Sequence, residues 1–266
     1  MTKIAIMGAS GRMGRMLIDA TLNQDHATLC GAFVRKNSSL IGVDAGEFIG
    51  TDKAGTSLSP MEGFTGACEV LIDFSLPEAL DETLDFCIKN DTALVMGVTG
   101  LDAKAEAKLK TASEKIAIVY AGNYSTGVNL SLNLLATTAR VLGLDADVEI
   151  IEKHHKHKLD APSGTALMMA KAVTDARNQA LTDTLVHGRH GQAKRTQGEI
   201  GVHAVRGGEI VGEHTVSFIM GGEIIEITHK AQSRSTFATG AVRAALWLKD
   251  KPAGLYDMQD VLGLKA

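Results

Sequence analysis

The amino-terminal segment constrains the fold more than any other part of the chain. Lys3–Met7 is a short apolar run of the kind that forms a buried parallel strand. Gly8, Gly11 and Gly14 follow it at once, and a helical segment then runs to Leu22. A strand, a glycine-rich turn and a helix in this order are typical of a dinucleotide-binding unit. Gly8 would permit the tight turn, Gly11 the approach of backbone N–H groups to a pyrophosphate, and Gly14 close helix–strand packing.

Strands and helices alternate over the first 125 residues or so. Apolar runs predict five strands, at Lys3–Met7, Thr28–Val34, Glu69–Phe74, Thr92–Gly97 and Ile116–Ala121. Helical segments lie between several of them, notably Pro77–Asn90 and Asp102–Glu114. This alternation predicts an α/β fold with a Rossmann-type, doubly wound parallel sheet and helices on both faces.

Ligands of such a sheet bind beyond the carboxyl ends of the strands, so the residues that follow each strand are the candidate cofactor contacts. They are Gly8, Ala9, Ser10, Gly11, Arg12 and Met13, then Val34, Arg35 and Lys36, then Ser75, then Gly97, Val98 and Thr99, and finally Ala121, Gly122, Asn123 and Tyr124. Loops also contain Gly, Asn and Ser for reasons of turn geometry alone.

The pattern changes after residue 126. Helices are predicted at Val128–Leu142 and Ser163–Arg177, and strands at Asp147–Glu152, Gly201–Arg206, Glu209–Met220 and Glu223–Ala231. Pairs of glycines, Gly207-Gly208 and Gly221-Gly222, separate the last three strands and predict tight hairpins. We therefore expect an α+β domain with a mainly antiparallel sheet over 127–234. The helical segment Thr236–Leu248 predicts a return to the first domain, which would comprise 1–126 completed by 235–266.

Histidine and lysine are concentrated just before one helix start. Six consecutive residues contain three of each, namely Lys153, His154, His155, Lys156, His157 and Lys158. The turn Asp160–Thr165 and an apolar helical run follow. Cations before a helix N-terminus favour a small anion, and histidine and lysine can move protons near neutral pH. A solvated charge run is the simpler alternative. A metal site is not expected, because the histidine spacing is not convergent and the lysines would repel a cation.

Composition narrows the class of protein. A length of 266 residues suits one large or two moderate domains, and a net charge of −4 argues against a nucleic-acid partner. Cys30, Cys68 and Cys87 form no C-x-x-C pair and are expected to stay reduced, as in the cytosol. No apolar run approaches about 18 residues, so no membrane span is expected.

A dinucleotide fold with a cationic pocket indicates hydride transfer to or from a small anion. At this point the chain resembles a known family, the 4-hydroxy-tetrahydrodipicolinate (dihydrodipicolinate) reductases. Glu149–Ala166 matches the family signature E-[IV]-x-E-x-H-x-x-x-K-x-D-x-P-S-G-T-A without a break. The resemblance also covers the amino-terminal G-x-x-G-R-M-G, Ala121–Ser125, Ile210–His214 and the segment from Ser233-Arg234 to Phe237-Ala238.

The resemblance implies a function and roles for residues. The reaction would be NAD(P)H-dependent reduction of 4-hydroxy-tetrahydrodipicolinate, a small dicarboxylate, in the diaminopimelate route to lysine. His154 would be the proton donor/acceptor and Lys158 the second proton donor, with substrate contacts at His155, Ser163, Gly164 and Thr165. Family members are cytoplasmic homotetramers joined through the sheet of the second domain, which the apolar alternation of 209–231 favours. That domain would thus serve substrate binding and oligomerisation.

Two positions depart from the family pattern. Val34 replaces the usual acidic residue at the end of the second strand and is followed by two cations, Arg35 and Lys36. Val98 replaces the first threonine of G-T-T. The first departure predicts NADPH as the preferred cofactor, with NADH still usable. The alternatives are another two-domain dehydrogenase, such as a relative of aspartate or homoserine dehydrogenase, and a redox-sensing NAD(P)-binding regulator without turnover.

Overall fold

A computed structural model describes residues 1–265 of the chain. The chain divides into two compact units. The first comprises Met1–Thr126 together with the segment from Ser235 onward, and the second comprises Gly127–Arg234. Among the helices of these residues, none is both long and apolar enough to cross a membrane.

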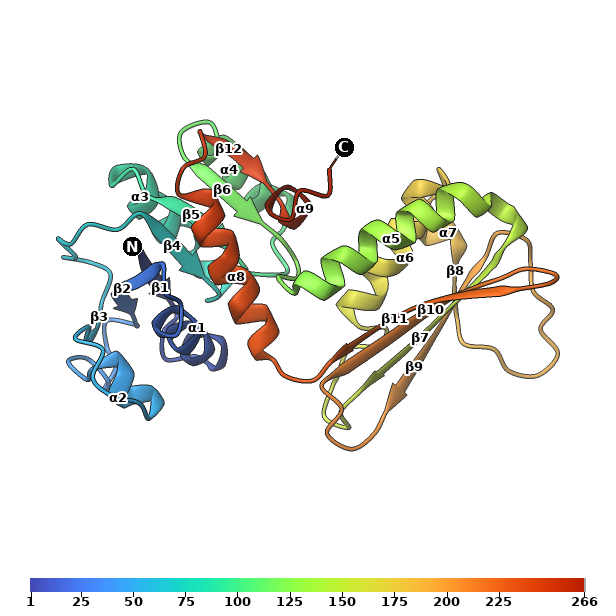
Figure 1. The fold of residues 1–266 in the computed structure, drawn as a ribbon, viewed down its shortest axis with the longest axis horizontal. Coiled ribbons are helices and arrows are strands. Elements are labelled where there is room, and N and C mark those ends of the chain that lie inside the picture. Colours follow the sequence, from blue (N-terminus) through green and yellow to red (C-terminus); the bar gives the residue numbers. More distant parts are fainter. Residues whose placement is uncertain (266) are drawn as a thin grey trace. The chain divides into compact units, whose positions relative to one another are not determined.

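The first unit is built on a seven-stranded sheet in which all neighbouring strands are parallel (Figure 1). Its order is β12-β6-β5-β4-β1-β2-β3. The strands are β1 (Thr2–Met7), β2 (Ala27–Phe33), β3 (Leu58–Ser59), β4 (Val70–Asp73), β5 (Ala93–Met96), β6 (Ala117–Tyr120) and β12 (Gly254–Tyr256). The predicted doubly wound parallel sheet is confirmed. The edge strands β3 and β12 were not predicted, because two or three residues carry no periodic signal.

Helices cover both faces of this sheet. They are α1 (Arg12–Leu22), α2 (Ala45–Ile49), α3 (Leu80–Lys89), α4 (Ala103–Ala112), α8 (Ser235–Leu248) and α9 (Met258–Val261), with a 3₁₀ turn at Pro77–Ala79. Ile4 and Ile6 of β1 pack in one buried cluster with α1 and α8, whereas Ala5 packs in a second cluster with α3 and α4. Because both faces are buried, the strands are continuous apolar runs.

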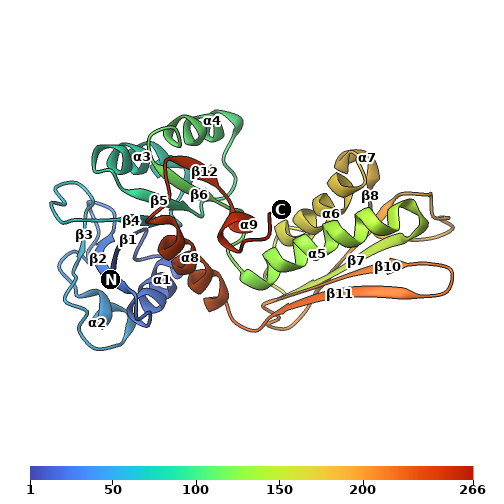
Figure 2. The same ribbon diagram turned by 45° about the horizontal axis from the view of Figure 1, so that its top comes forward.

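The second unit holds a five-stranded sheet in the order β11-β10-β7-β9-β8. Its strands are β7 (Asp147–His154), β8 (Leu185–His187), β9 (Ile200–Arg206), β10 (Gly212–Ile219) and β11 (Ile224–Ala231). Pairing is antiparallel along β11-β10-β7 and parallel along β7-β9-β8. The helices of this unit are α5 (Thr126–Leu142), α6 (Gly164–Ala176) and α7 (Leu181–Thr184), with a 3₁₀ turn at Gly143–Asp145. Figure 2 shows α5 and α6 on the same side of the sheet.

One of the two predicted hairpins is wrong. The glycines Gly221-Gly222 do join the antiparallel neighbours β10 and β11, but β7 lies between β9 and β10. Gly207 donates its N–H to the carbonyl of His154 (2.9 Å), and Lys156 donates to the carbonyl of Gly208 (3.2 Å). The two glycines therefore bond to the end of β7, and the chain crosses that end before β10 begins.

Side chains of β7 alternate between the two faces of the sheet. Val148 and Ile150 are buried in one core with α5 and α6, and Glu152 and His154 continue the same face toward the end of the strand. The odd-numbered residues, such as Ile151, lie on the opposite face and are more exposed. The position of His154 thus follows from the alternation that buries Ile150.

Candidate active site

The centre of the candidate site is a pair of side chains at the end of β7. His154 is 8% exposed, and Glu152, two residues earlier on the same face, is fully buried. Nδ1 of His154 lies 2.6 Å from Oε2 of Glu152. Histidine was predicted here, but Glu152 was not proposed as a site residue, although its position two residues before His154 puts it on the same face of a strand.

Arg206 completes the support of Glu152. Its Nη1 and Nη2 donate to the two carboxylate oxygens of Glu152, each at 2.7 Å. This is the bidentate geometry of a strong charge-assisted pair. Arg206 is at the end of β9, opposite His154 in the register of the parallel pair β7–β9. The sequence offered no sign of this contact, because it depends on which strand lies beside β7.

The ionisation of these groups follows from burial and from their partners. Burial lowers the pKa of His154; Glu152 opposes this, whereas Lys158 and Arg206 add to it. Burial alone would raise the pKa of Glu152, but hydrogen bonds, first from Arg206 and then from His154, bring it below the ordinary value. Near pH 7 the site therefore combines a neutral imidazole with an ionised carboxylate.

The N-terminus of α6 lies beside this pair. Ser163 is the N-cap, and its hydroxyl accepts from the Ala166 N–H (3.2 Å). Its backbone N–H donates to Glu152 Oε1 (3.0 Å), and its hydroxyl lies 2.9 Å from Nε2 of His214, another buried residue that sequence reasoning did not propose. The first turn of α6 contains no acidic side chain. An anion can therefore approach the positive end of the helix dipole.

The segment between β7 and α6 contains two further predicted residues, His155 and Lys158. Nζ of Lys158 lies 2.7 Å from Oδ1 of Asp160. A guanidinium nitrogen of Arg234 lies 3.3 Å from Nε2 of His155, and because guanidinium only donates, His155 accepts there. Nδ1 of His155 then carries the proton, and it is buried without a partner among residues 1–265. The solvated-charge alternative fits Lys153, Lys156 and His157, whose side chains are exposed.

In the first unit, the predicted cofactor loops all follow carboxyl ends of parallel strands, at β1, β2, β4, β5 and β6 (Figure 1). Gly8 has φ +75°, and a Cβ on Gly14 would lie 2.3 Å from the carbonyl oxygen of Gly8. The N-cap of α1, Gly11, offers no side-chain acceptor, and the first turn has no acidic residue. This arrangement of backbone N–H groups fits the pyrophosphate of a dinucleotide.

Several other residues proposed for cofactor binding have side chains that are buried in the hydrophobic core. Val34 and Val98 are almost fully buried in the two clusters that flank the sheet. Tyr124 is also buried, and its hydroxyl lies 2.8 Å from the carbonyl oxygen of Met96. A cofactor contact of these residues can come only from their backbone. Lys36 is exposed but forms an ion pair with Glu62 (2.6 Å).

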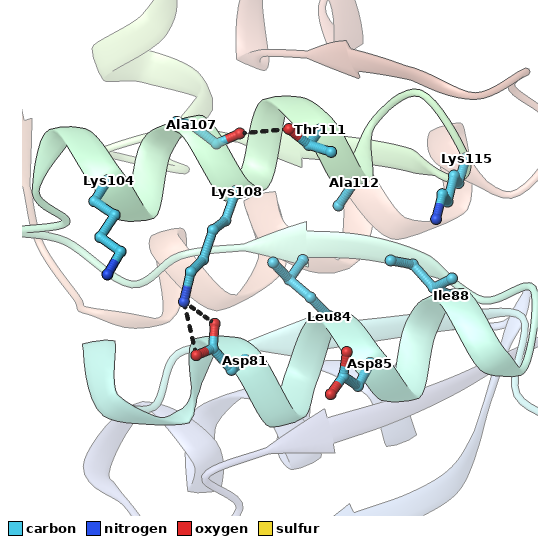
Figure 3. A pocket seen from close by; sticks show the side chains of 10 residues that line it. All are labelled: Asp81, Leu84, Asp85, Ile88, Lys104, Ala107, Lys108, Thr111, Ala112 and Lys115. Atoms are coloured by element: carbon cyan, nitrogen blue, oxygen red, sulfur yellow. Dashed lines mark hydrogen bonds and ion pairs between the residues drawn. The ribbon is translucent and has the colours of Figure 1, made fainter.

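A groove of about 550 Å³ lies between α3 and α4 (Figure 3). The carboxylates of Asp81 and Asp85 line one side, and the amines of Lys104, Lys108 and Lys115 line the other. Lys108 contacts both carboxylate oxygens of Asp81. The groove contains none of the residues proposed for catalysis or cofactor binding, so it does not compete with the site on β7.

Two family models together match almost the whole chain. The model of the dihydrodipicolinate reductase N-terminus matches residues 2–124, and that of its C-terminus matches residues 127–262. A 4-hydroxy-tetrahydrodipicolinate reductase of Psychrobacter arcticus is 54% identical over 99% of this chain and 96% of its own length. The same enzyme of Pseudomonas fluorescens is 54% identical over 99% of this chain and 100% of its own length.

Solved structures share the fold. A dipicolinate-bound dihydrodipicolinate reductase from Paenisporosarcina sp. TG-14 superposes with a TM-score of 0.76 at 22% identity, covering 98% of each chain. GenD2 of gentamicin A biosynthesis, in complex with NAD, gives 0.58 at 11% identity, covering 99% of this chain and 90% of its own. The fold alone therefore does not separate this chain from other dehydrogenases. The matches in sequence do, and by them the chain belongs to the dihydrodipicolinate reductase family of NAD(P)H-dependent oxidoreductases.

Proposed function

We propose that the Glu152–His154 pair, Lys158 and the N-terminus of α6 form the site at which this chain reduces 4-hydroxy-tetrahydrodipicolinate. The family carries out this NAD(P)H-dependent reduction in the diaminopimelate route to lysine. The observation that carries the proposal is the neutral, buried His154 placed beside a helix N-terminus that can receive an anion.

The reaction adds a hydride and a proton to the substrate and releases water, giving tetrahydrodipicolinate and oxidised cofactor. When bound, the dinucleotide supplies the hydride. His154 takes up and passes on the proton at Nε2, the nitrogen that faces away from Glu152. Lys158 is the second proton donor and also attracts the negative charge of the substrate.

Backbone and side-chain donors hold the substrate carboxylates. The N–H groups of Gly164 and Thr165 lie in the first turn of α6, and the Nδ1–H of His155 has no partner of its own within residues 1–265. The relative from Paenisporosarcina was solved with dipicolinate, a planar ring with two carboxylates. Such a ring would match the substrate in charge but accept no hydride, so it would compete with substrate at α6.

The cofactor loops favour NADPH over NADH. The side chain of Val34 cannot accept hydrogen bonds from ribose hydroxyls and does not repel a 2′-phosphate. Arg35 is exposed beside it. Because Lys36 is paired with Glu62, Arg35 is the cation that we assign to the 2′-phosphate.

A homotetramer is the assembly that the second unit supports. The face of its sheet opposite α5 and α6 bears exposed apolar side chains, including Ile151 (40% exposed) and Ile224 (60% exposed). Exposed apolar side chains on an uncovered sheet face are typical of an oligomer interface. The wide face of a five-stranded sheet suits association through this unit.

The proposed function is tested by turnover. Aspartate semialdehyde and pyruvate are incubated with the preceding synthase of the route and NADPH, and absorbance of the reduced cofactor is followed. We expect oxidation that requires both the synthase and this protein, and that pyridine-2,6-dicarboxylate inhibits competitively with substrate. Binding of NADPH without synthase-dependent oxidation would instead support the alternative of a sensing regulator.

A further inference from the structure

Glu152 is a buried carboxylate whose two oxygens accept four hydrogen bonds. Oε2 accepts from His154 Nδ1 (2.6 Å) and Arg206 Nη1 (2.7 Å). Oε1 accepts from Arg206 Nη2 (2.7 Å) and from the backbone N–H of Ser163 (3.0 Å). Nη2 of Arg206 also donates to the carbonyl of Asp160 (2.7 Å). One carboxylate thus joins the imidazole, the start of α6 and the segment that precedes it.

We propose that Glu152, kept ionised by Arg206, is a positioning residue that fixes the tautomer of His154 and leaves Nε2 as the nitrogen that exchanges a proton with the substrate. This inference rests on the proposed role of His154 in proton transfer. It assigns to the glutamate of the family signature, and to an arginine outside it, a definite task in the reaction.

The tautomer follows from the chemistry of the two partners. An ionised carboxylate can only accept, so the hydrogen between Glu152 and His154 belongs to Nδ1. A neutral imidazole then has its lone pair on Nε2. Among residues 1–265, no hydrogen bond to Nε2 is formed. A Cβ on Gly212 would lie 3.0 Å from Nε2, so the glycine leaves space beside this nitrogen.

Charged and titratable groups reach His154 from every neighbouring element. Glu152 on its own strand draws a proton toward the imidazole, whereas Arg206 on β9 and Lys158 in the following segment oppose it. On β10 the ring of His214 lies 5.1 Å from that of His154. Burial lowers the pKa of His214 to about 4, so His214 is neutral near pH 7. The residue paired with His214 on β11 is His229. Arg206 is the group that most strongly lowers the pKa of Glu152, and at His154 it acts together with Lys158.

Replacement by glutamine should reverse the tautomer. In Glu152→Gln, the amide oxygen should face Arg206 Nη2 and the Ser163 N–H, because two groups that can only donate lie there, whereas Arg206 Nη1 is the single such donor at the other position. The amide nitrogen then faces His154 and donates to Nδ1, which moves the imidazole proton to Nε2. A wrong tautomer of this kind is the reported effect of replacing the orienting carboxylate in the serine-protease triad.

The direct test is ¹⁵N NMR of the histidine side chains in the folded protein at neutral pH. We expect His154 of the wild type to be protonated at Nδ1 and that of Glu152→Gln at Nε2. Glu149→Gln is the matched control, because Glu149 is on the opposite face of β7 and also contacts Arg195 and His203; it should leave the His154 tautomer unchanged. A wild-type His154 protonated at Nε2 would overturn the proposal without any variant.

Kinetics give an independent readout. Glu152→Gln should lower kcat roughly 10²–10⁴-fold, and the double variant with His154→Gln should be no slower than His154→Gln alone.

The pH profile tests Arg206. Arg206→Gln should move the acid limb of kcat/KM to higher pH, and Arg206→Lys, which keeps the charge, should move that limb part of the way back. Additive losses with an unchanged pH profile would show a merely structural role. If His154→Gln itself keeps full activity, it is the proposed function that fails, and the NMR result still decides the tautomer.

Discussion

At the scale of single residues, His214 links the site to the pH dependence of stability. It is buried, and burial lowers its pKa from 6.5 to about 4. As the pH falls through 6.5, the unfolded chain binds a proton at this residue and the folded chain does not, so stability is lost down to about pH 4. The pKa difference corresponds to roughly 3 kcal/mol. In His214→Gln this part of the loss should vanish.

Urea unfolding at pH 7 and at pH 4.5 or so measures that difference. His190→Gln, at an exposed histidine of the same unit, is the control and should follow the wild type. Equal losses of unfolding free energy in the wild type and His214→Gln would show that His214 is readily protonated in the folded protein.

Arg35 determines the cofactor preference in our account. Loss of a charge-assisted contact costs about 1.5–3 kcal/mol, so Arg35→Ala should lower kcat/KM for NADPH roughly tenfold or more and change the value for NADH little. Lys53→Ala removes another exposed cation of the same unit and controls for net charge. A wild-type preference for NADH, or an NADPH value that Arg35→Ala leaves unchanged, would exclude this loop as the phosphate site.

The residues proposed to carry out the chemistry could be predicted further than those proposed to support them. The types and spacing of the histidine–lysine cluster and of the Ser163–Thr165 helix start predict proton transfer and anion binding, and the family resemblance singled out His154 and Lys158. Arg206 could not be found, because its contact with Glu152 exists only through the register of β7 and β9. Glu152 could have been proposed from the alternation of β7, because it lies two residues before His154 on the same face of the strand.

At the scale of elements, the close packing of α1 on β1 depends on Gly14. A Cβ there would lie 2.3 Å from the carbonyl oxygen of Gly8 and 2.6 Å from backbone atoms of Ala9. Overpacking costs about 1–3 kcal/mol, which exceeds the gain of about 0.5–1 kcal/mol from alanine in a helix. Gly14→Ala should therefore lower both the free energy of unfolding and the affinity for NADPH.

The measurements are urea unfolding and NADPH titration by fluorescence. Gly222→Ala is a suitable control, because a Cβ on Gly222 meets no atom within 4 Å. Wild-type stability and affinity in Gly14→Ala would show that α1 does not need this close approach.

The positions of the longer strands could be predicted from the sequence, but which strands lie side by side could be predicted only in part. The five apolar runs of the first unit coincide with β1, β2, β4, β5 and β6, because burial on both faces leaves a continuous signal. The Gly207-Gly208 hairpin was wrong because two glycines suit any sharp change of direction. Here they bond to the end of β7, and hydrogen bonds between distant strands decided the order.

At the scale of the whole molecule, the open face of the second sheet should join copies of the chain. A charge at Ile151, in the middle strand of that face, would be buried in a tetramer at a cost of several kcal/mol. Ile151→Glu should therefore yield smaller species in sedimentation equilibrium, whereas Val141→Glu, on the 77% exposed position of α5, should not. A wild-type monomer, or an Ile151→Glu protein of wild-type mass, would refute this interface.

The central claim is that reduction proceeds through the imidazole of His154. The most direct measurement compares kcat of the wild type, His154→Gln and His157→Gln in the synthase-coupled NADPH assay, with NADPH affinity measured alongside. His157 belongs to the same segment, but its side chain is 69% exposed. The account predicts that His154→Gln loses roughly 10²–10⁴-fold in kcat with unchanged NADPH affinity, while His157→Gln stays near wild type. Near wild-type kcat in His154→Gln would contradict it.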